Sequence, residues 1–383
     1  MRGGTPALPR VLFVGRARLR FPLSESLERR FEALSGELDW RQLGTVVAGR
    51  PASDGRFVLG RPFPVRILDG PVHYLALPFR VVRELRRFRP EVVIAQGAQE
   101  TALTLLARRL AGSRAAVVLD LHGDWRVPTR LYGSRARTLL SPLADALARV
   151  ALRRADAVRT ITTYTTELVR AEGVEPAAEF PAFMDLRVFT ANPPTPLPDT
   201  PRALFVGVLE RYKAFDVLAD AWRLVAGRLP EAVLHVVGEG ALSSVAETLV
   251  AELPGRVEWS PSLSADEVAE ALDASTLLVL PSRSEGMGRV VIEAACRGRA
   301  VVGSRVGGIP DVVADGVTGV LVPPGDPRAL AEALVRVLSD RALAALLGDG
   351  ARAAAEPWLV SPEEYARRVR GLVDEVVSRS AGV

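Results

Sequence analysis

The stretch PRALFVGVLERYKAFDVLADAWRLVAGRLPEAVLHVVGEG, residues 201–240, shows the pattern on which the fold prediction rests. It holds an apolar run at 203–206 that ends at Gly207, an amphipathic segment at 216–229, and a second apolar run at 233–237 that ends at Gly238. Short apolar runs bounded by glycine predict buried strands, and the amphipathic segment predicts a helix between them. Strands that alternate with helices in this way form parallel sheets with helices on both faces.

The same alternation fills most of the chain. Strands are also expected at 11–14, 91–95, 115–120, 157–161, 276–280 and 300–303, with helices at 24–34, 100–110, 141–154 and 361–378. Five of the ten residues at 192–201 are proline, which predicts a linker. The expected organisation is a Rossmann-like domain at 1–190, a linker at 191–201, a second such domain at 202–360 and a C-terminal helix at 361–383.

The composition excludes several classes of protein. With 383 residues, 48% of them hydrophobic and 25% charged, the chain is globular and too long for one compact core. No apolar run reaches the roughly 18 residues of a membrane span, and the first ten residues lack the apolar core of a secretory signal. The single cysteine, Cys296, excludes an intramolecular disulfide and a zinc site of clustered cysteines. These features predict a cytoplasmic protein without a structural metal.

Charge is distributed unevenly along the chain. Of the 49 basic and 45 acidic residues, 30 basic and 19 acidic ones lie in residues 1–190, so the remainder is acidic on balance. The basic half is expected to meet a membrane surface or a phosphorylated acceptor, although an arginine-rich solvated surface explains the imbalance equally well. Nucleic acid is disfavoured, because the chain has no helix-turn-helix, zinc-finger or RNA-binding signature and few aromatic residues for base stacking.

Two features of the second half indicate a phosphate-bearing ligand. Lys213 is the only lysine in the chain and follows a predicted strand, which suits a compact ammonium at a phosphate, although chance also explains one lysine. The segment SEGMGRVVIE at 284–293 places glycines before a helix start, where backbone N–H groups bind phosphate. A well-capped structural helix would look the same. The dinucleotide alternative is weaker, because GEGALS at 238–243 lacks the last glycine of its motif.

These motifs together resemble glycosyltransferase family 4, retaining sugar-nucleotide-dependent transferases of the GT-B fold. The resemblance is carried by 207–213, by 285–293, by GGIPD at 307–311, by 315–326 and, in the first half, by RADAV at 154–158. It implies two Rossmann-like domains that face each other across a cleft, an acceptor domain first and a donor domain second. It also implies a C-terminal helix that packs back on the first domain, and a UDP- or GDP-sugar donor with no metal or other cofactor.

The resemblance assigns roles to individual residues. The catalytic set it implies is His122 over the donor sugar, Lys213 at the donor diphosphate and Glu285 facing the sugar. Glu293 is implied to bind the ribose hydroxyls. The full donor-binding set is Gly207, Arg211, Lys213, Glu285, Gly286, Met287, Gly288, Arg289, Val290 and Glu293.

The chain departs from the family pattern at three places. Val208 stands where many members have an arginine, and Arg211 is a candidate substitute. Ala214 replaces a glycine, a change expected to matter little. The glycine-rich loop after the first strand is replaced by Gly15 followed by Arg16, Arg18 and Arg20. Alternate residues of an extended segment project to one side, so the three arginines are expected to face a phosphorylated or acidic acceptor, and Gly15, Arg16 and Arg18 are expected on the acceptor side.

The expected activity is therefore transfer of a hexose-type sugar with retention of configuration to an acceptor that the sequence does not identify. Departure of a nucleoside diphosphate builds negative charge, which Lys213 and the N–H groups near Gly286 would stabilise. Two other functions stay open: a sugar-nucleotide epimerase of the same fold, and a non-catalytic sugar-nucleotide-binding protein. The expected location is the cytoplasm, with peripheral contact of the basic half to the inner face of a membrane as an open alternative.

Overall fold

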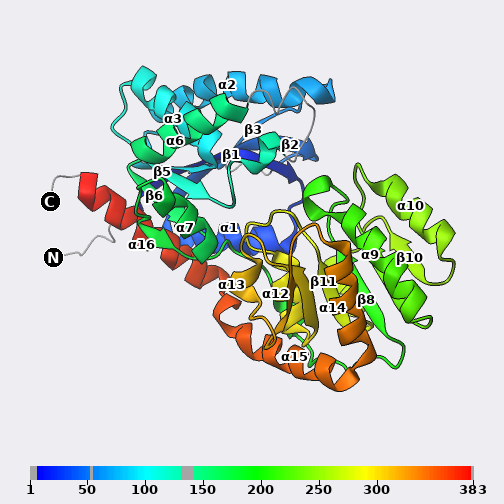
Figure 1. The fold of residues 1–383 in the computed structure, drawn as a ribbon. Helices are drawn as coiled ribbons and strands as arrows, with labels where there is room; N and C mark the ends of the chain where they lie inside the picture. Colours follow the sequence, from blue (N-terminus) through cyan, green and yellow to red (C-terminus); the bar gives the residue numbers. More distant parts are fainter. Residues whose placement is uncertain (1–6, 52–54, 131–140, 381–383) are drawn as a thin grey trace, which may run out of the picture. The chain divides into compact units, whose positions relative to one another are not determined.

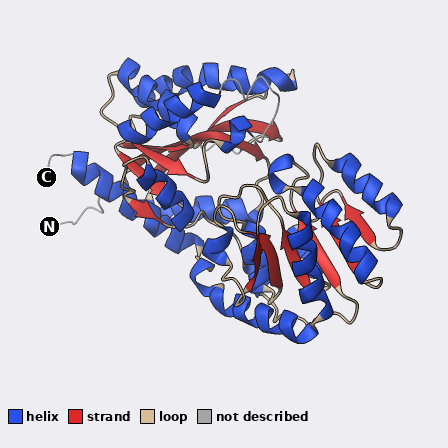
Figure 2. Cartoon of the chain, viewed as in Figure 1, coloured by secondary structure: helices blue, strands red, loops and turns tan. Residues whose placement is uncertain are grey.

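The computed structural model describes residues 7–51, 55–130 and 141–380, which form two compact units (Figure 1). The first unit contains the described chain up to 126, 141–183 and the segment from 360, and the second contains 127–130 and 184–359. In each unit, strands of one parallel sheet lie between helices (Figure 2). The predicted pair of Rossmann-like α/β domains is confirmed. None of the helices in the described ranges is long and apolar enough to cross a membrane.

The first unit has a seven-stranded sheet in the order β3-β2-β1-β4-β5-β6-β7. Its strands are β1 (Arg10–Arg20), β2 (Asp39–Ala48), β3 (Phe57–Gly60), β4 (Val92–Gln96), β5 (Ala116–Leu121), β6 (Ala157–Thr160) and β7 (Ala178–Glu179). Its helices are α1 (Glu25–Glu37), α2 (Arg66–Arg87), α3 (Ala98–Ala111), α6 (Ser141–Arg154), α7 (Thr163–Ala171) and α16 (Pro362–Ser380).

The central strand β1 shows why both faces of this sheet are covered. Val11 and Phe13 lie in the same apolar cluster as side chains of α1 and α16, whereas Leu12 and Val14 lie in a cluster with α2 and α3. Successive residues of a strand point to opposite faces, so a strand buried on both sides is apolar throughout. The run VLFV at 11–14 is such a strand.

The C-terminal helix α16 belongs to the first unit, although the second unit precedes it in the sequence. It packs along α1 and contacts β4 and β5, where Tyr365 and Leu372 are buried in the same cluster as Phe31. A guanidinium nitrogen of Arg370 donates to the carbonyl oxygen of Glu37 at 3.0 Å and fixes α16 at the end of α1.

The second unit has a six-stranded sheet in the order β10-β9-β8-β11-β12-β13. Its strands are β8 (Arg202–Val206), β9 (Val233–Val237), β10 (Val257–Ser260), β11 (Leu277–Leu280), β12 (Ala300–Ser304) and β13 (Gly319–Val322). The helices are α8 (Arg187–Thr190), α9 (Phe215–Arg228), α10 (Ser243–Glu252), α11 (Ala265–Asp273), α12 (Arg289–Cys296), α13 (Ile309–Val312), α14 (Pro327–Ser339) and α15 (Arg341–Ala354). Short segments are α4 (Val127–Arg130) and the 3₁₀ turns η1 (Arg211–Lys213) and η2 (Glu356–Trp358).

The proline-rich segment 192–201 contains no helix or strand and is held against the second unit by arginines. Arg297 donates to the carbonyl oxygen of Asn192 at 2.6 Å, and Arg299 donates to that of Thr195 at 2.9 Å. Both guanidinium groups are almost fully buried and also lie near Asp273. Prolines cannot donate backbone hydrogen bonds, so the free carbonyl groups of this segment become the acceptors that anchor it.

Candidate functional site

The strand order of the second unit singles out one place for a ligand. The chain runs from β8 outward to β9 and β10, and then returns to the other side of β8 to form β11. The loops after β8 and β11 therefore leave the sheet in different directions, and the carboxyl ends of two such strands are where sheets of this kind bind ligands. Lys213 follows β8 and Glu285 follows β11, so the two residues that the sequence singled out lie at this switch point.

Lys213 and Glu285 form an ion pair there. The Lys213 Nζ lies 2.5 Å from Oε2 of Glu285, and both side chains are largely buried, with 12% and 14% of their surfaces exposed. The hydroxyl of the buried Ser282 lies 3.5 Å from the same carboxylate oxygen. The single lysine of the chain is thus held in one place by a carboxylate, which sets it apart from the many exposed arginines.

A second ion pair ties the two loops together. The guanidinium of Arg283 donates to both carboxylate oxygens of Asp216 at 2.8 and 2.7 Å and to the carbonyl oxygen of Arg211 at 2.8 Å. Its backbone N–H donates to the carbonyl of Tyr212 at 2.7 Å. These contacts fix the turn that carries Lys213 against the loop that carries Glu285.

Glycines at 307 and 308 let the loop after β12 pack closely against the loop that carries Glu285. Gly307, with φ +56°, lies against the backbone of Glu285, and a Cβ at Gly307 would overlap the carbonyl oxygen of Glu285. A Cβ at Gly308 would likewise overlap the carbonyl of Gly286, and the N–H of Gly308 donates to the carbonyl of Glu285 at 3.1 Å. Only glycine fits at 307 without strain, because the conformation and the space both exclude a side chain.

The loop after β9 is built in the same way. Gly238 has φ +135°, and a Cβ there would overlap the carbonyl oxygen of Gly207. The N–H of Leu209 donates to the carbonyl of Glu239 at 3.0 Å. From the sequence, 238–243 is a weak match to a dinucleotide-binding motif. In the structure, Gly238 instead packs against the loop that leads to Lys213.

The helix α12 begins at the same edge. Its N-cap is Gly288, in the left-handed conformation with φ 76°, and the first N–H groups of a helix have no acceptor within that helix. Glu293, one turn further on, is buried and accepts from Nε of Arg289 at 2.7 Å. Burial raises the pKa of Glu293, and the ion pair with Arg289 opposes that shift.

The remaining residues of the predicted donor set lie on the same loops with different exposure. Gly207 and Gly286 are half-buried, whereas Met287, Gly288 and Val290 are buried. Arg211 and Arg289 are exposed. The switch point therefore brings together backbone, two carboxylates and one lysine.

The first unit places His122 in a separate polar cluster. His122 directly follows β5, and its Nε2 lies 2.9 Å from Oδ2 of Asp120 and 3.3 Å from the amide nitrogen of Gln96. The other Asp120 oxygen accepts from Arg159 at 2.6 Å, and both of these side chains are buried. Burial disfavours the charged form of Asp120, but Arg159 and His122 outweigh it and hold the pKa of Asp120 below its ordinary value. Sequence reasoning missed Arg159.

The predicted acceptor-side residues lie at the end of β1. Gly15 packs on the side chain of Gln96, and the side chains of Arg16 and Arg18 are exposed. Both guanidinium groups pair with Asp69 of α2, at 3.1 and 2.5 Å. The N–H of Phe63 and these arginines lower the pKa of Asp69 to about 2. Two arginines therefore share one carboxylate, and the cluster keeps a net positive charge.

Comparison with known proteins identifies the family. Residues 200–340 match the family described as glycosyl transferases group 1, and residues 15–180 match the glycosyl transferase 4-like domain. The chain belongs to this glycosyltransferase family. Within the described ranges, no group of three or more His, Cys, Asp or Glu side chains is arranged to hold a metal ion.

Several curated glycosyltransferases are similar in sequence. The sulfoquinovosyl transferase of Arabidopsis thaliana is 28% identical over 322 residues, which cover 79% of this chain and 60% of that protein. The D-inositol 3-phosphate glycosyltransferase of Nocardioides sp. is 33% identical over 231 residues, which cover 56% of this chain and 50% of that protein. The chain thus spans about half the length of the curated relatives that it matches.

Solved structures share the fold. Sucrose-phosphate synthase from Thermosynechococcus elongatus has a TM-score of 0.77 and 21% identity over 97% of this chain and 100% of that chain. The Anabaena protein HepE, in complex with UDP-glucose, has a TM-score of 0.66 and 20% identity over 97% of this chain and 99% of that chain. Both confirm the predicted GT-B class of two Rossmann-like domains.

At Ala214, where the chain departs from the family pattern, the backbone conformation favours the glycine of the family. Ala214 caps η1 with φ 54° and ψ 41°, a left-handed conformation that favours glycine, and it is fully buried. The family's glycine is the unstrained choice there, and the alanine adds a methyl group to the apolar cluster of α9. Val208, in contrast, is 47% exposed and does not have a left-handed backbone conformation.

A substitution at Gly307 tests whether the loop packing matters. Gly307→Ala is expected to lower the free energy of unfolding by about 2–4 kcal/mol, because it adds left-handed strain and forces the Glu285 carbonyl to move. Urea denaturation measures this. Gly316→Ala is the matched control, because Gly316 has φ +75° with nothing within 4 Å of its Cβ position, so only the strain applies. Equal losses in both variants would show that the contact with Glu285 does not matter.

Proposed function

We propose that this chain is a glycosyltransferase that moves a hexose-type sugar, with retention of configuration, from a nucleoside diphosphate sugar to a phosphate-bearing acceptor. The observation that carries the proposal is the Lys213–Glu285 ion pair at the switch point of the second sheet, 2.5 Å long and largely buried. Family membership supports the reaction class, and the UDP-glucose bound to HepE supports a sugar-nucleotide donor.

The pair suits the charge changes of this reaction. When the sugar leaves, negative charge collects on the departing phosphate and the sugar becomes positively charged. An ammonium held by a carboxylate is already in position to donate to that phosphate, and the Glu285 carboxylate can accept from sugar hydroxyls. Glu293 is proposed to accept from the ribose hydroxyls, and His122 is proposed to contact the donor sugar. In a retaining front-face reaction, the departing phosphate oxygen takes the proton of the acceptor hydroxyl.

The acceptor is proposed to carry a phosphate. Arg16 and Arg18 share Asp69, and Arg20 of the same strand is also exposed, so an anion would meet an excess of positive charge there. Planar guanidinium groups bind phosphate through paired hydrogen bonds. The name of the Nocardioides relative also contains a phosphorylated polyol, which supports this acceptor class.

A transfer assay with labelled UDP- and GDP-sugars and a panel of neutral and phosphorylated polyols tests both parts. We expect label to move to a phosphorylated acceptor. Replacing Arg16, Arg18 and Arg20 by alanine should raise the acceptor KM by about tenfold or more, with the donor KM unchanged, because charge-assisted hydrogen bonds are lost. Arg50→Ala, at another exposed arginine of this unit, is the control. Label that returns to the nucleotide as an epimer, or equal use of neutral acceptors, would contradict the proposal.

A further inference from the structure

Helix α2 carries an exposed apolar stripe that the proposed reaction does not use. Leu75 is 73% exposed and Phe79 is 77% exposed, and Val72 lies one turn before them. The exposed residues Arg83 and Arg86 continue the same stripe at helical spacing. The opposite side of α2 packs on the sheet, so the stripe faces away from the core.

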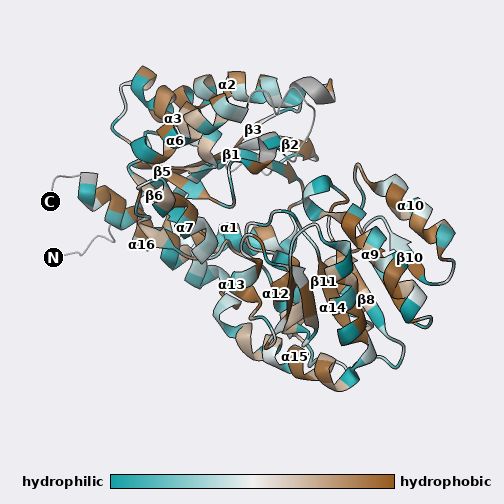
Figure 3. Cartoon of the chain, in the orientation of Figure 1, coloured by the Kyte–Doolittle hydropathy of each residue, from teal (hydrophilic) through white to brown (hydrophobic). Residues whose placement is uncertain are grey.

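Two neighbouring helices present the same pattern. Leu106 and Leu110 of α3 are exposed, as are Leu143, Leu147 and Val150 of α6. The helix α3 packs against both α2 and α6. The three helices cover the same face of the first sheet, and hydrophobic residues are interspersed along each of them (Figure 3). We call the exposed stripes of α2, α3 and α6 the outer face.

On these three helices, acidic and basic side chains differ in their exposure to solvent. Within their described parts, every acidic side chain is buried, namely Asp69, Glu84, Glu100 and Asp145. The exposed charged residues are all arginines, namely Arg83, Arg86, Arg87, Arg109, Arg149, Arg153 and Arg154. Two of the α6 arginines lie 3.7–3.9 Å from Glu172, and the outer face as a whole remains strongly positive.

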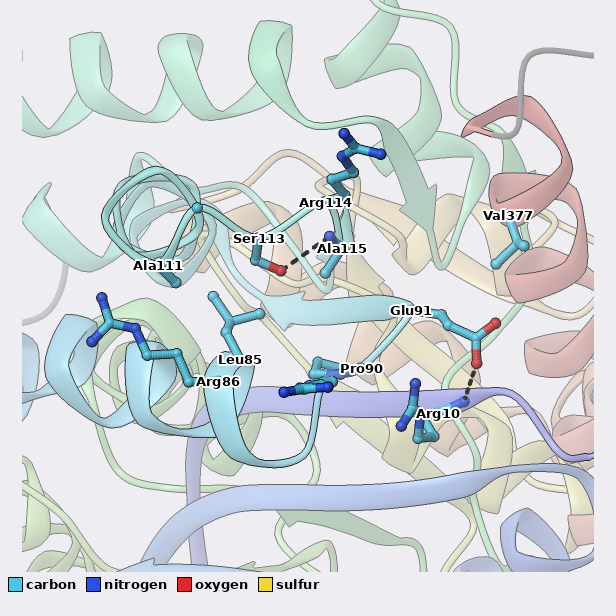
Figure 4. A pocket seen from close by; sticks show the side chains of 12 residues that line it. Arg10, Leu85, Arg86, Pro90, Glu91, Ala111, Ser113, Arg114, Ala115 and Val377 are labelled. Carbon is cyan, nitrogen blue, oxygen red and sulfur yellow. Dashed lines mark hydrogen bonds between the residues drawn. The ribbon is translucent and has the colours of Figure 1, made fainter.

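An open cavity of about 630 Å³ lies at the edge of the sheet, where the C-terminal ends of α2 and α3 meet the start of β1 and Val377 of α16. Its lining includes Arg10, Arg86 and Arg114, which come from three different segments (Figure 4), and also Arg89. The one acidic residue in that lining, Glu91, accepts from the backbone N–H of Arg10 at 3.1 Å. Arg86 belongs both to the stripe of α2 and to the cavity, so the two features are continuous.

We propose that the outer face docks on an anionic lipid bilayer, with apolar side chains in the interface and lipid phosphates among the arginines and in the cavity. Interfacial protein surfaces combine exposed apolar residues with basic residues that attract anionic lipids. Charge complementarity favours this occupant over a second copy of the chain, because two such faces would bring arginines against arginines. The proposal does not depend on the transfer reaction.

Flotation of the full chain with vesicles tests the proposal. We expect binding to phosphatidylcholine vesicles that contain phosphatidylglycerol, weaker binding to phosphatidylcholine alone, and weakening by salt. The variant Leu75→Glu/Phe79→Glu should lose about tenfold or more of the affinity for these vesicles. The variant Arg83→Glu/Arg86→Glu should show a loss of the same size. All four side chains are exposed, so the fold should persist, and unchanged unfolding midpoints check this.

The matched control lies on α15 of the second unit. Leu346 is 67% exposed and Arg352 is exposed, so Leu346→Glu/Arg352→Glu combines one apolar-to-acidic and one basic-to-acidic change at another exposed helix. Vesicle binding that this control lowers equally, or no vesicle binding at all, would overturn the proposal. A shift from dimer to monomer in the α2 variants, without vesicle binding, would instead show that the outer face joins two copies.

Discussion

Lys213→Ala is expected to lower kcat/KM for sugar transfer by about 30- to 1,000-fold. This range corresponds to a loss of about 2–4 kcal/mol of transition-state stabilisation, the usual cost of removing a group that stabilises developing negative charge. The Lys213 ammonium is held 2.5 Å from the Glu285 carboxylate and is largely buried, so solvent cannot easily replace it. Steady-state kinetics with saturating acceptor measure the effect, and the unfolding midpoint shows whether the variant is folded.

Two comparisons sharpen this test. Lys213→Arg should recover only part of the activity, because a planar guanidinium does not match the position of a compact ammonium in a restricted space. Arg211→Ala should have a smaller effect than Lys213→Ala, because Arg211 is exposed. If Arg211→Ala were the more damaging of the two, the main phosphate contact would belong to Arg211.

Asp120→Asn is expected to lower the free energy of unfolding by about 3–5 kcal/mol. The substitution leaves the Arg159 guanidinium, which has only 2% of its side chain exposed, without its carboxylate partner. Arg159 also donates to the carbonyl oxygens of Phe180 and Pro181 and lies 4.0 Å from the centre of the Phe180 ring, so it cannot turn toward solvent without disrupting these contacts. Urea denaturation at neutral pH measures the loss.

The same pair predicts a pH dependence. Because the pKa of Asp120 is held below its ordinary value in the folded protein, the unfolded chain takes up this proton first on acidification. The stabilisation by Asp120 is therefore complete above about pH 4 and declines as the pH falls further. The difference in stability between wild type and Asp120→Asn should shrink below that pH. A difference that stays constant on acidification would contradict this account.

The donor side of the site was predictable because its signals are local. A strand that ends in glycine, followed by the only lysine, and a glycine-rich helix start with two spaced glutamates can be located from the sequence. Parallel strands bring their carboxyl ends to one edge, so residues 72 positions apart meet there. What the sequence could not show is that Lys213 and Glu285 pair directly, because that depends on how two loops pack.

Two other features were missed for different reasons. Helix α2 was not among the helices expected from the sequence, and it contains Pro71 and Pro78, residues that disfavour a helix interior. Packing of Leu77 and Val81 on the sheet stabilises the helix in spite of them. The outer face includes the exposed stripe of this helix, so the sequence alone did not predict it.

One feature of the sequence does indicate the Asp120–Arg159 pair. Arg159 interrupts an apolar run that was correctly predicted as a strand, and a buried arginine requires a carboxylate partner. Asp120 and Arg159 are register partners on the adjacent strands β5 and β6. Naming the partner, however, requires the strand order, which a single sequence does not provide.

The most direct test of the central claim is titration calorimetry of UDP- and GDP-sugars against wild type and Lys213→Ala, with and without EDTA. The account predicts that one nucleotide class binds wild type, that EDTA leaves this affinity unchanged, and that Lys213→Ala binds at least about tenfold more weakly. Equal affinity in the two proteins, or no binding of any sugar nucleotide to wild type, would contradict the placement of the donor at Lys213 and Glu285.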